Sequence, residues 1–234
     1  MAKILLTGFE AYGNTPENPA EAVARRLDGK LIDESIIVSR IVPNNFFECI
    51  DFVWDSIAET SPDIVVMMGE YGGRAMVTVE RIAQNLNDST RYGLADNNGC
   101  SLQGQLTVAD GPAAYYSTLP IRAMVKAMRE SGIPSDTSDV TGTFCCNHLM
   151  YGILHRIHIN SLPIRAGWIH LPHLPSVAAL PENLGAPSMS VETSAMGVEI
   201  GLRAVLENLR DIEEPILSRL QSNHPPAKPG ALNS

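Results

Sequence analysis

Residues 62–69 read PDIVVMMG, and this stretch decides the fold class. After Asp63 the run is apolar up to Gly69, and Pro62 and Gly69 bound it as residues that interrupt regular structure. A strand that is apolar along its length is buried on both faces, which is typical of a sheet covered by helices. Residues 63–68 are therefore predicted to form a central strand.

Segments of strand and helix character alternate on both sides of this run, as in an α/β fold. Asn18 followed by Pro19 marks a helix start with Asn18 as the N-cap. The pattern leaves residues 77–86 undecided between strand and helix, and a strand-like segment at residues 139–143 leads into Cys146. Further strands are expected at residues 3–7, 36–42 and 165–171, a long loop at 87–112, and helices at 18–27, 46–57, 119–130, 149–157 and 190–209.

The composition is that of a packed, acidic protein. Of the 234 residues, 44% are hydrophobic and only 18% are charged, so most of the chain should be folded. No linker or internal repeat divides it, and we expect one domain over residues 1–212, followed by a flexible tail at residues 213–234. The net charge of -9 argues against nucleic acid or an anionic membrane surface as a partner.

Apolar runs are too short for a bilayer, which requires about 18 consecutive residues. The first apolar run ends at Gly8, too early for the core of a signal peptide. We therefore expect a cytoplasmic protein without a membrane partner.

The four cysteines, Cys49, Cys100, Cys145 and Cys146, contain no CxxC pair and fit free thiols in a reducing compartment. Residues 141–148 read TGTFCCNH, where the strand-like segment meets a helix start. First-turn N–H groups and the positive helix end lower the pKa of a thiol there. Free cysteines are also common as small buried apolar residues, so the sequence leaves both interpretations open.

A thiol nucleophile needs a base, and His170 is the leading candidate because it ends the strand-like run GWIH. His173 lies beyond Pro172 and is the weaker choice. The three histidines of one helix, His148, His155 and His158, fit a solvated or hydrogen-bonded role.

The base needs an orienting carboxylate, and Glu80 is a candidate because it stands in the sheet-like run TVERIA. A buried acid is costly unless it is paired. A simple ion pair with Arg74 or Arg81, or an exposed strand face, explains the same pattern.

Two other chemistries are disfavoured by spacing. Pro172 breaks any helical register between His170 and His173, and HExxH and paired CxxC motifs are absent, so we expect no metal. Residues 8–13, GFEAYG, match neither GxGxxG nor GxxxxGK[ST], so we expect no nucleotide and no cofactor.

Taken together, the motifs resemble the pyroglutamyl peptidase I family of cysteine peptidases, also called pyrrolidone carboxyl peptidases. The resemblance runs from residue 3 to about residue 209. Its most specific parts are GTFCCNHL at residues 142–149 and GWIHLP at 167–172, and it includes LTGFE (6–10), NP (18–19), GGR (72–74), ERIA (80–83) and DGPAAY (110–115).

The resemblance implies a single-domain, three-layer α/β/α sandwich with a mixed, mostly parallel central sheet, like phosphorylases and hydrolases. It implies hydrolysis of the amide bond after an N-terminal pyroglutamyl residue through a thioester. The implied nucleophile, base and orienting acid are Cys146, His170 and Glu80. It also implies peptide substrates and a homo-oligomer, often a tetramer.

The implied pocket has Phe9, Tyr12 and Phe144 as walls, with Asn18 and the backbone near Glu70 pairing with the lactam. Core packing remains the alternative for Phe9 and Phe144, and helix capping for Asn18. Arg91 matches an arginine near the family site, and we expect it to support the oxyanion or the glutamate.

The chain departs from the family pattern near this pocket. Glu70 and Tyr71 stand where the family usually has Gln-Ala, Tyr12 replaces a phenylalanine, and Cys145 replaces a common valine. The loop at residues 91–99 is longer than usual. Glu70 and Tyr71 allow one alternative, a thiol hydrolase for another small lactam or amide. Two further alternatives are a non-catalytic binding module that retains the fold, and a nucleoside phosphorylase-like enzyme, because that fold is related.

Overall fold

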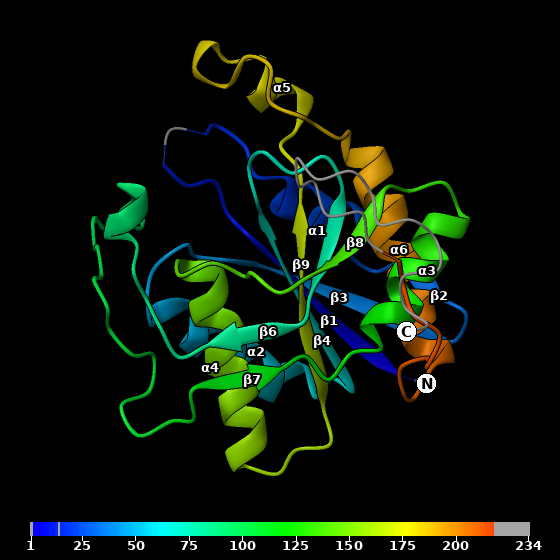
Figure 1. Ribbon diagram of the computed structural model, residues 1–234. Coiled ribbons are helices and arrows are strands. Elements are labelled where there is room, and N and C mark those ends of the chain that lie inside the picture. The colour runs from blue at the N-terminus through cyan, green and yellow to red at the C-terminus, as the bar shows by residue number, and fades with distance from the viewer. Residues whose placement is uncertain (1, 14, 218–234) are drawn as a thin grey trace, which may run out of the picture.

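The computed structural model describes residues 2–13 and 15–217, which fold around one seven-stranded sheet (Figure 1). The strands lie in the order β2-β3-β1-β4-β9-β5-β8. Their bounds are Lys3–Phe9 for β1, Leu31–Ile32 for β2, Ser35–Val42 for β3, Ile64–Glu70 for β4, Val77–Glu80 for β5, Ser135–Ser138 for β8 and Arg165–Leu171 for β9.

The sheet is mixed and mostly parallel. β1 pairs in parallel with β3 and β4, β4 with β9, and β5 with β8. The antiparallel pairs are β2 with β3 and β5 with β9. The strand predicted at residues 63–68 is β4, which is buried along its length between β1 and β9, as its apolar run indicated.

Helices cover both faces of the sheet and complete the three predicted layers. The bounds are Pro19–Leu27 for α1, Glu48–Thr60 for α2, Ile121–Glu130 for α3, Cys145–Ile159 for α4 and Val191–Glu207 for α6. Alternate strand residues point to opposite faces: Leu6 packs in the core with α1, α3 and α6, whereas Leu5 packs in the core with α2 and α4. The predicted α/β/α sandwich is confirmed.

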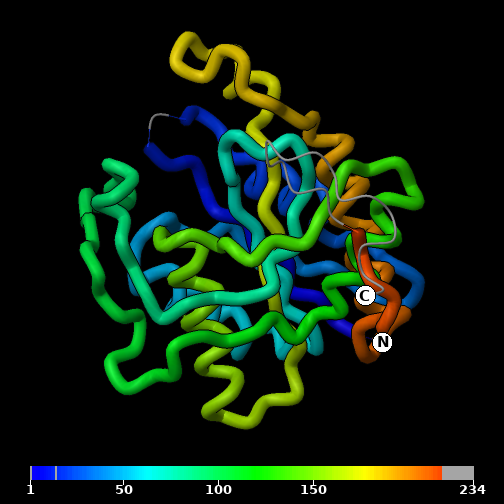
Figure 2. Tube along the Cα trace, in the orientation of Figure 1, coloured from blue at the N-terminus to red at the C-terminus, as the bar shows by residue number. Residues whose placement is uncertain are grey.

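A small hairpin-like sheet lies outside the main one. It pairs β6 (Ile82–Gln84) with β7 (Ala114–Tyr116), and both strands contact α4. Residues 87–112, predicted as a loop, connect them and run along the outer side of the molecule (Figure 2). Three short helical turns complete the chain: η1 (Thr90–Tyr92), α5 (Pro175–Ala178) and η2 (Pro181–Asn183).

Two segments differ from simple sequence expectations. The undecided residues 77–86 are two strands, β5 and β6, that part at Arg81 and join different sheets. The strand-like segment at residues 139–143 is not a strand, because β8 ends at Ser138 and Gly142 has a φ of 89°, which breaks an extended chain. This loop lets Thr141 donate a 2.6 Å hydrogen bond to the Ile82 carbonyl.

The domain bounds at residues 1–212 and the flexible tail at 213–234 remain predictions. Residues 213–217 contain no helix or strand, and residues 218–234 lie outside the described part of the chain. Within the described ranges, no helix combines the length and the apolar character needed to cross a bilayer.

We predict that Gly8→Ala destabilises the fold. A Cβ at Gly8 would lie 2.2 Å from the backbone oxygen of Ala20, so β1 and α1 would have to move apart. Overpacking of this kind costs about 1–3 kcal/mol, which should appear as a lower urea midpoint.

Gly201→Ala in α6 is the matched control, because its added Cβ would meet only the end of Met124 at 3.4 Å. Alanine is favoured over glycine in a helix by about 0.5–1 kcal/mol, so this midpoint should stay or rise. Equal midpoints for Gly8→Ala and the wild type would contradict the close packing of β1 on α1.

Candidate active site

Cys146 is the second residue of α4 and lies at the carboxyl ends of the central strands. The extended Phe144 is the N-cap residue, and the first N–H groups of a helix have no partner within it. The position requires glycine at residue 69 of β4, since a Cβ there would lie 2.9 Å from the Cys146 Sγ. The predicted helix start at this cysteine is confirmed.

His170 and Glu80 approach from neighbouring strands on the same face of the sheet. Val79 and Ile169 pack in the core with α1, α3 and α6, so the residues next to them point toward α4. The Nδ1 of His170 lies 2.8 Å from the Oε1 of Glu80. A carboxylate only accepts, so Nδ1 carries the proton.

The other ring nitrogen of His170, Nε2, is free to accept a proton. His170 is 1% exposed, and its Nε2 makes no hydrogen bond within the described part of the chain. Cys146 and His170 line the same cavity. An imidazole whose Nε2 has no partner, in a cavity that a thiol also lines, is a candidate general base.

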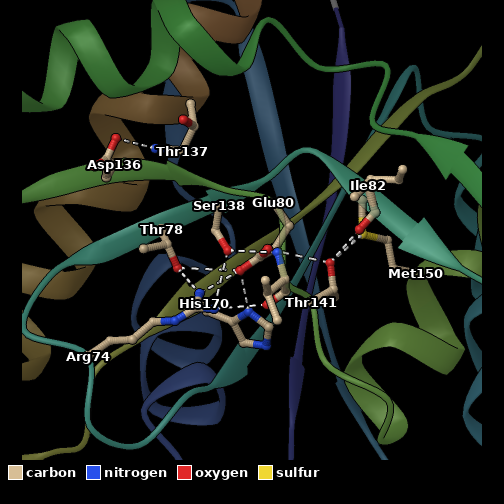
Figure 3. A network of polar contacts seen from close by, with 11 residues as sticks. Arg74, Thr78, Glu80, Ile82, Asp136, Thr137, Ser138, Thr141, Met150 and His170 are labelled. Atoms are coloured by element: carbon tan, nitrogen blue, oxygen red, sulfur yellow. Dashed lines mark hydrogen bonds and ion pairs between the residues drawn. The ribbon is translucent and has the colours of Figure 1, made fainter. Parts of the chain in front are cut away.

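Glu80 is fully buried and bound by several donors (Figure 3). The Nη1 of Arg74 lies 2.6 Å from Oε1, and the Thr141 Oγ1 lies 3.4 Å from Oε2. Burial raises the pKa of Glu80, but the hydrogen bond and charge of His170 and the guanidinium of Arg74 outweigh it and lower the pKa to about 2. Glu80 therefore combines the ion pair and the imidazole contact that the sequence offered as alternatives.

Burial disfavours the charged form of both the thiol and the imidazole. Burial raises the pKa of Cys146, as does the charge of Glu80, and these effects exceed the lowering by Arg74 and by the backbone N–H of Cys146. Burial also lowers the pKa of His170 despite the contact with Glu80. The backbone N–H at the helix start does lower the pKa of the thiol, as expected, but burial has the larger effect and the net shift is upward.

The cavity beside these residues has a volume of about 180 Å³. Pockets for drug-sized ligands begin at about 300 Å³, so this one suits a single small ring. Two aromatic pairs build its wall, with Tyr12 and Phe144 at 6.0 Å between ring centroids and Phe9 on Trp168 at 5.6 Å. The predicted pocket residues that line it are Phe9, Tyr12, Asn18, Glu70 and Phe144.

Comparison with known proteins decides the family. The sequence profile described as pyroglutamyl peptidase matches residues 2–208. The chain belongs to the pyroglutamyl peptidase family. Its relatives include the pyrrolidone-carboxylate peptidase of Mycobacterium tuberculosis (strain ATCC 25618 / H37Rv), 58% identical over 94% of this chain and 100% of the relative. The enzyme of the same name from Enterobacter sp. (strain 638) is 42% identical over 91% of this chain and 96% of the relative.

Solved structures of the family share the fold. The pyroglutamyl peptidase I of Bacillus amyloliquefaciens superposes with a TM-score of 0.86 at 36% identity, covering 92% of this chain and 99% of that one. The pyrrolidone carboxyl peptidase of Thermococcus litoralis gives a TM-score of 0.87 at 34% identity, covering 92% and 100%.

Asn18 makes further contacts besides lining the cavity, and Arg91 lies away from the cavity. Asn18 caps α1: its Oδ1 accepts from the Ala20 N–H and its Nδ2 donates to the Glu10 carbonyl, both at 2.9 Å. Arg91 is exposed on η1, outside the cavity lining, with its guanidinium 5.2 Å from the centre of the Tyr92 ring. The arginine support of Glu80 comes from Arg74 instead.

A second carboxylate–imidazole pair stands where the chain departs from the family pattern. Glu70 is buried, and its Oε1 lies 2.7 Å from the Nδ1 of His173. Burial raises the pKa of Glu70, and the contacts with His173 and Tyr12 reduce that rise. The sequence analysis considered His173 only as the weaker candidate base. It did not predict the pair with Glu70, because the two residues are far apart along the chain.

The remaining candidates are structural. Cys145 is fully buried, and burial raises its pKa well above the ordinary thiol value. His148 is also buried, with its Nε2 accepting from the Phe47 N–H at 2.9 Å. Asn147 fixes the start of α4 to β6, since its side chain accepts from the Gln84 N–H and donates to the Gln84 carbonyl, each at 2.8 Å.

We predict that Glu80→Gln lowers stability in a pH-dependent way. The pKa of Glu80 falls from its ordinary value of 4.5 to about 2 in the fold, so its stabilisation is complete above pH 4.5 and is lost as pH falls toward 2. This difference corresponds to about 3 kcal/mol at neutral pH. Urea unfolding should show a wide gap from the wild type at neutral pH and a narrower gap in acid.

Asp139→Asn is the matched control, because Asp139 is exposed and its ion pair is with Arg81. Exposed pairs contribute about 0–1 kcal/mol, so this variant should stay close to the wild type. A Glu80→Gln gap that does not change with pH would contradict the lowered pKa of Glu80.

Proposed function

We propose that this chain hydrolyses the amide bond after an N-terminal pyroglutamyl residue of peptides, with Cys146 as nucleophile, His170 as base and Glu80 as orienting acid. The observation that carries the proposal is the buried His170–Glu80 pair: the Nε2 of His170 has no partner within the described part of the chain, and His170 and Cys146 line the same cavity. Membership of the pyroglutamyl peptidase family and the names of the relatives support it.

The first step is proton transfer from the Cys146 thiol to the Nε2 of His170. Burial disfavours the charged forms of both groups, so the ion pair forms as the thiolate attacks the carbonyl that joins pyroglutamate to the next residue. Glu80 accepts from Nδ1–H throughout and stabilises the imidazolium that results.

The tetrahedral oxyanion needs donors that are already in place. The backbone N–H of Cys146 is in the first turn of α4, where it has no helical partner and where the helix dipole favours negative charge. His170 then gives its proton to the leaving amine, and water hydrolyses the thioester with His170 again as base.

The small cavity, with aromatic side chains in its wall, fits an uncharged five-membered lactam. The buried Glu70–His173 pair favours one second candidate, a thiol hydrolase with the same mechanism that acts on another small lactam or amide. A pocket with an ionisable pair at its wall selects for ligand groups that match its donors and acceptors.

We also propose that the protein acts on these peptides in the cytoplasm and as a homo-oligomer, with a tetramer as the first hypothesis. The free cysteines support a reducing compartment. Size-exclusion chromatography with light scattering measures the oligomeric state directly.

We predict that the purified protein releases coumarin from a pyroglutamyl-coumarin amide and leaves a prolyl-coumarin amide intact. Cys146→Ser should abolish release, because a hydroxyl is a far weaker nucleophile here than a thiol. Cys145→Ser, at the neighbouring buried position, should retain it. Fluorescence assays on reduced protein check all three.

Folded, reduced wild-type protein that turns over neither substrate would disprove the pyroglutamyl assignment. Turnover of another small lactam or amide by that protein, lost in Cys146→Ser, would establish the second candidate. Phosphate-dependent turnover that survives thiol alkylation would point to a phosphorylase-like enzyme.

A further inference from the structure

We propose that Tyr71 and Arg74 are positioning residues that hold the His170–Glu80 pair in its reactive geometry. They close a ring of four side chains in the order His170, Glu80, Arg74, Tyr71. The inference rests on the proposed function, since it assigns His170 as the base. It assigns a role to the arginine of the GGR motif and to Tyr71, one of the residues by which this pocket departs from the family pattern.

Each neighbouring pair in this ring is in contact. His170 Nδ1 lies 2.8 Å from Glu80 Oε1, and Arg74 Nη1 lies 2.6 Å from the same oxygen. The Arg74 guanidinium stacks over Tyr71 at 3.7 Å from the ring centroid. The Tyr71 ring meets His170 edge to face, with centroids 5.2 Å apart and planes at 79°.

A tight turn after β4 brings the two residues together. Gly73 has a φ of 84°, and the Arg74 N–H donates to the Tyr71 carbonyl at 3.4 Å. This reversal places the side chains of Tyr71 and Arg74 against each other. The glycine is required because other residues rarely adopt this backbone conformation.

Further bonds fix the guanidinium in place. Its Nη2 donates to the Ser138 Oγ at 3.2 Å and to the Val140 carbonyl at 2.9 Å, and its Nη1 also contacts Thr78 (Figure 3). The Arg74 side chain is only 17% exposed. A planar guanidinium with fixed donors orients a carboxylate more strictly than an ammonium does.

The charge of Arg74 also acts on both catalytic partners. It lowers the pKa of Glu80, together with the larger contributions of His170, against the opposing effect of burial. It lowers the pKa of His170 too, in addition to the larger effect of burial. Without the charge of Arg74, only the negative charge of Glu80 acts on the imidazole. The pKa of His170 should therefore rise, which favours imidazolium.

Imidazolium cannot accept the thiol proton, so the acid limb of activity reports the pKa of His170. In Arg74→Gln we expect this limb to move to higher pH by about one unit, the shift that a nearby charge produces. We expect kcat to fall about tenfold with a nearly unchanged KM, because Arg74 does not line the cavity.

The remaining variants separate charge from position. Arg74→Lys keeps the charge but loses the planar stack, so its acid limb should stay near that of the wild type while kcat falls. Tyr71→Phe should resemble the wild type, and Tyr71→Ala should lower kcat. The double variant Tyr71→Ala/Arg74→Gln should lose less than the product of the single losses, because both changes open the same ring.

Arg81→Gln is the matched control. Arg81 adjoins Glu80 in sequence, but its side chain points to the surface and pairs with Asp139 at 2.9 Å. This variant should keep the acid limb and kcat of the wild type. Thermal melts identify any variant that does not fold, and Arg74→Lys and Tyr71→Ala carry the test if Arg74→Gln is one of them.

A second readout does not depend on the substrate. The rate of Cys146 alkylation by iodoacetamide, in a Cys100→Ser background that removes the exposed cysteine, measures proton transfer to His170 directly. Its acid limb should shift in Arg74→Gln as the activity profile does. If wild-type protein turns over no pyroglutamyl substrate, the proposed function fails, and the alkylation profile still tests the ring.

An unshifted acid limb in Arg74→Gln by both readouts would overturn the role of Arg74. A kcat for Tyr71→Ala equal to that of the wild type would overturn the role of Tyr71. Losses that multiply fully in the double variant would show that the two residues act separately rather than as one ring.

Discussion

The buried carboxylate of Glu80 is the interaction on which the site depends. Its Oε1 serves two donors at once, the Nδ1–H of His170 at 2.8 Å and the Arg74 guanidinium at 2.6 Å. A buried anion without partners is costly, so these two donors are needed for the stability of the fold as well as for the chemistry. The antiparallel pairing of β5 with β9 brings Glu80 and His170 together, and this pair points toward α4 because strand residues alternate.

The fold was largely predictable because its signals are local. The apolar run of β4, the Asn18–Pro19 start of α1 and the strand β9 each occur where the sequence indicates them. The failures are positions where long-range contacts decide. Residues 77–86 are ambiguous by pattern because β5 and β6 belong to different sheets, and residues 139–143 look like a strand although Gly142 turns the chain to reach Ile82.

The site was predictable in its chemistry but less so in its partners. The position of Cys146 at a helix start made it a candidate nucleophile from the sequence. The pairing of Glu80 with His170 came from the family resemblance, because pattern alone did not choose among several acids and histidines. Asn18 shows the opposite case, since the local capping signal described its contacts better than the pocket role did. The contact of Tyr71 with Arg74 depends on a turn at Gly73, which no periodicity reveals.

The two carboxylate–imidazole pairs near the pocket contain the same groups, but their surroundings shift the pKa values of the two carboxyls in opposite directions. Glu80 and Glu70 each lie within 2.8 Å and 2.7 Å of an imidazole Nδ1, and both side chains are buried. Arg74 compensates Glu80, and its pKa falls, whereas burial prevails at Glu70 and its pKa rises. Strand alternation separates them as well: Gly69 faces Cys146, so the next residue, Glu70, leaves β4 on the other face. In the His170–Glu80 pair, on the side of the thiol, the carboxylate keeps a negative charge that stabilises an imidazolium. The Glu70–His173 pair is suited to shaping the wall of the pocket.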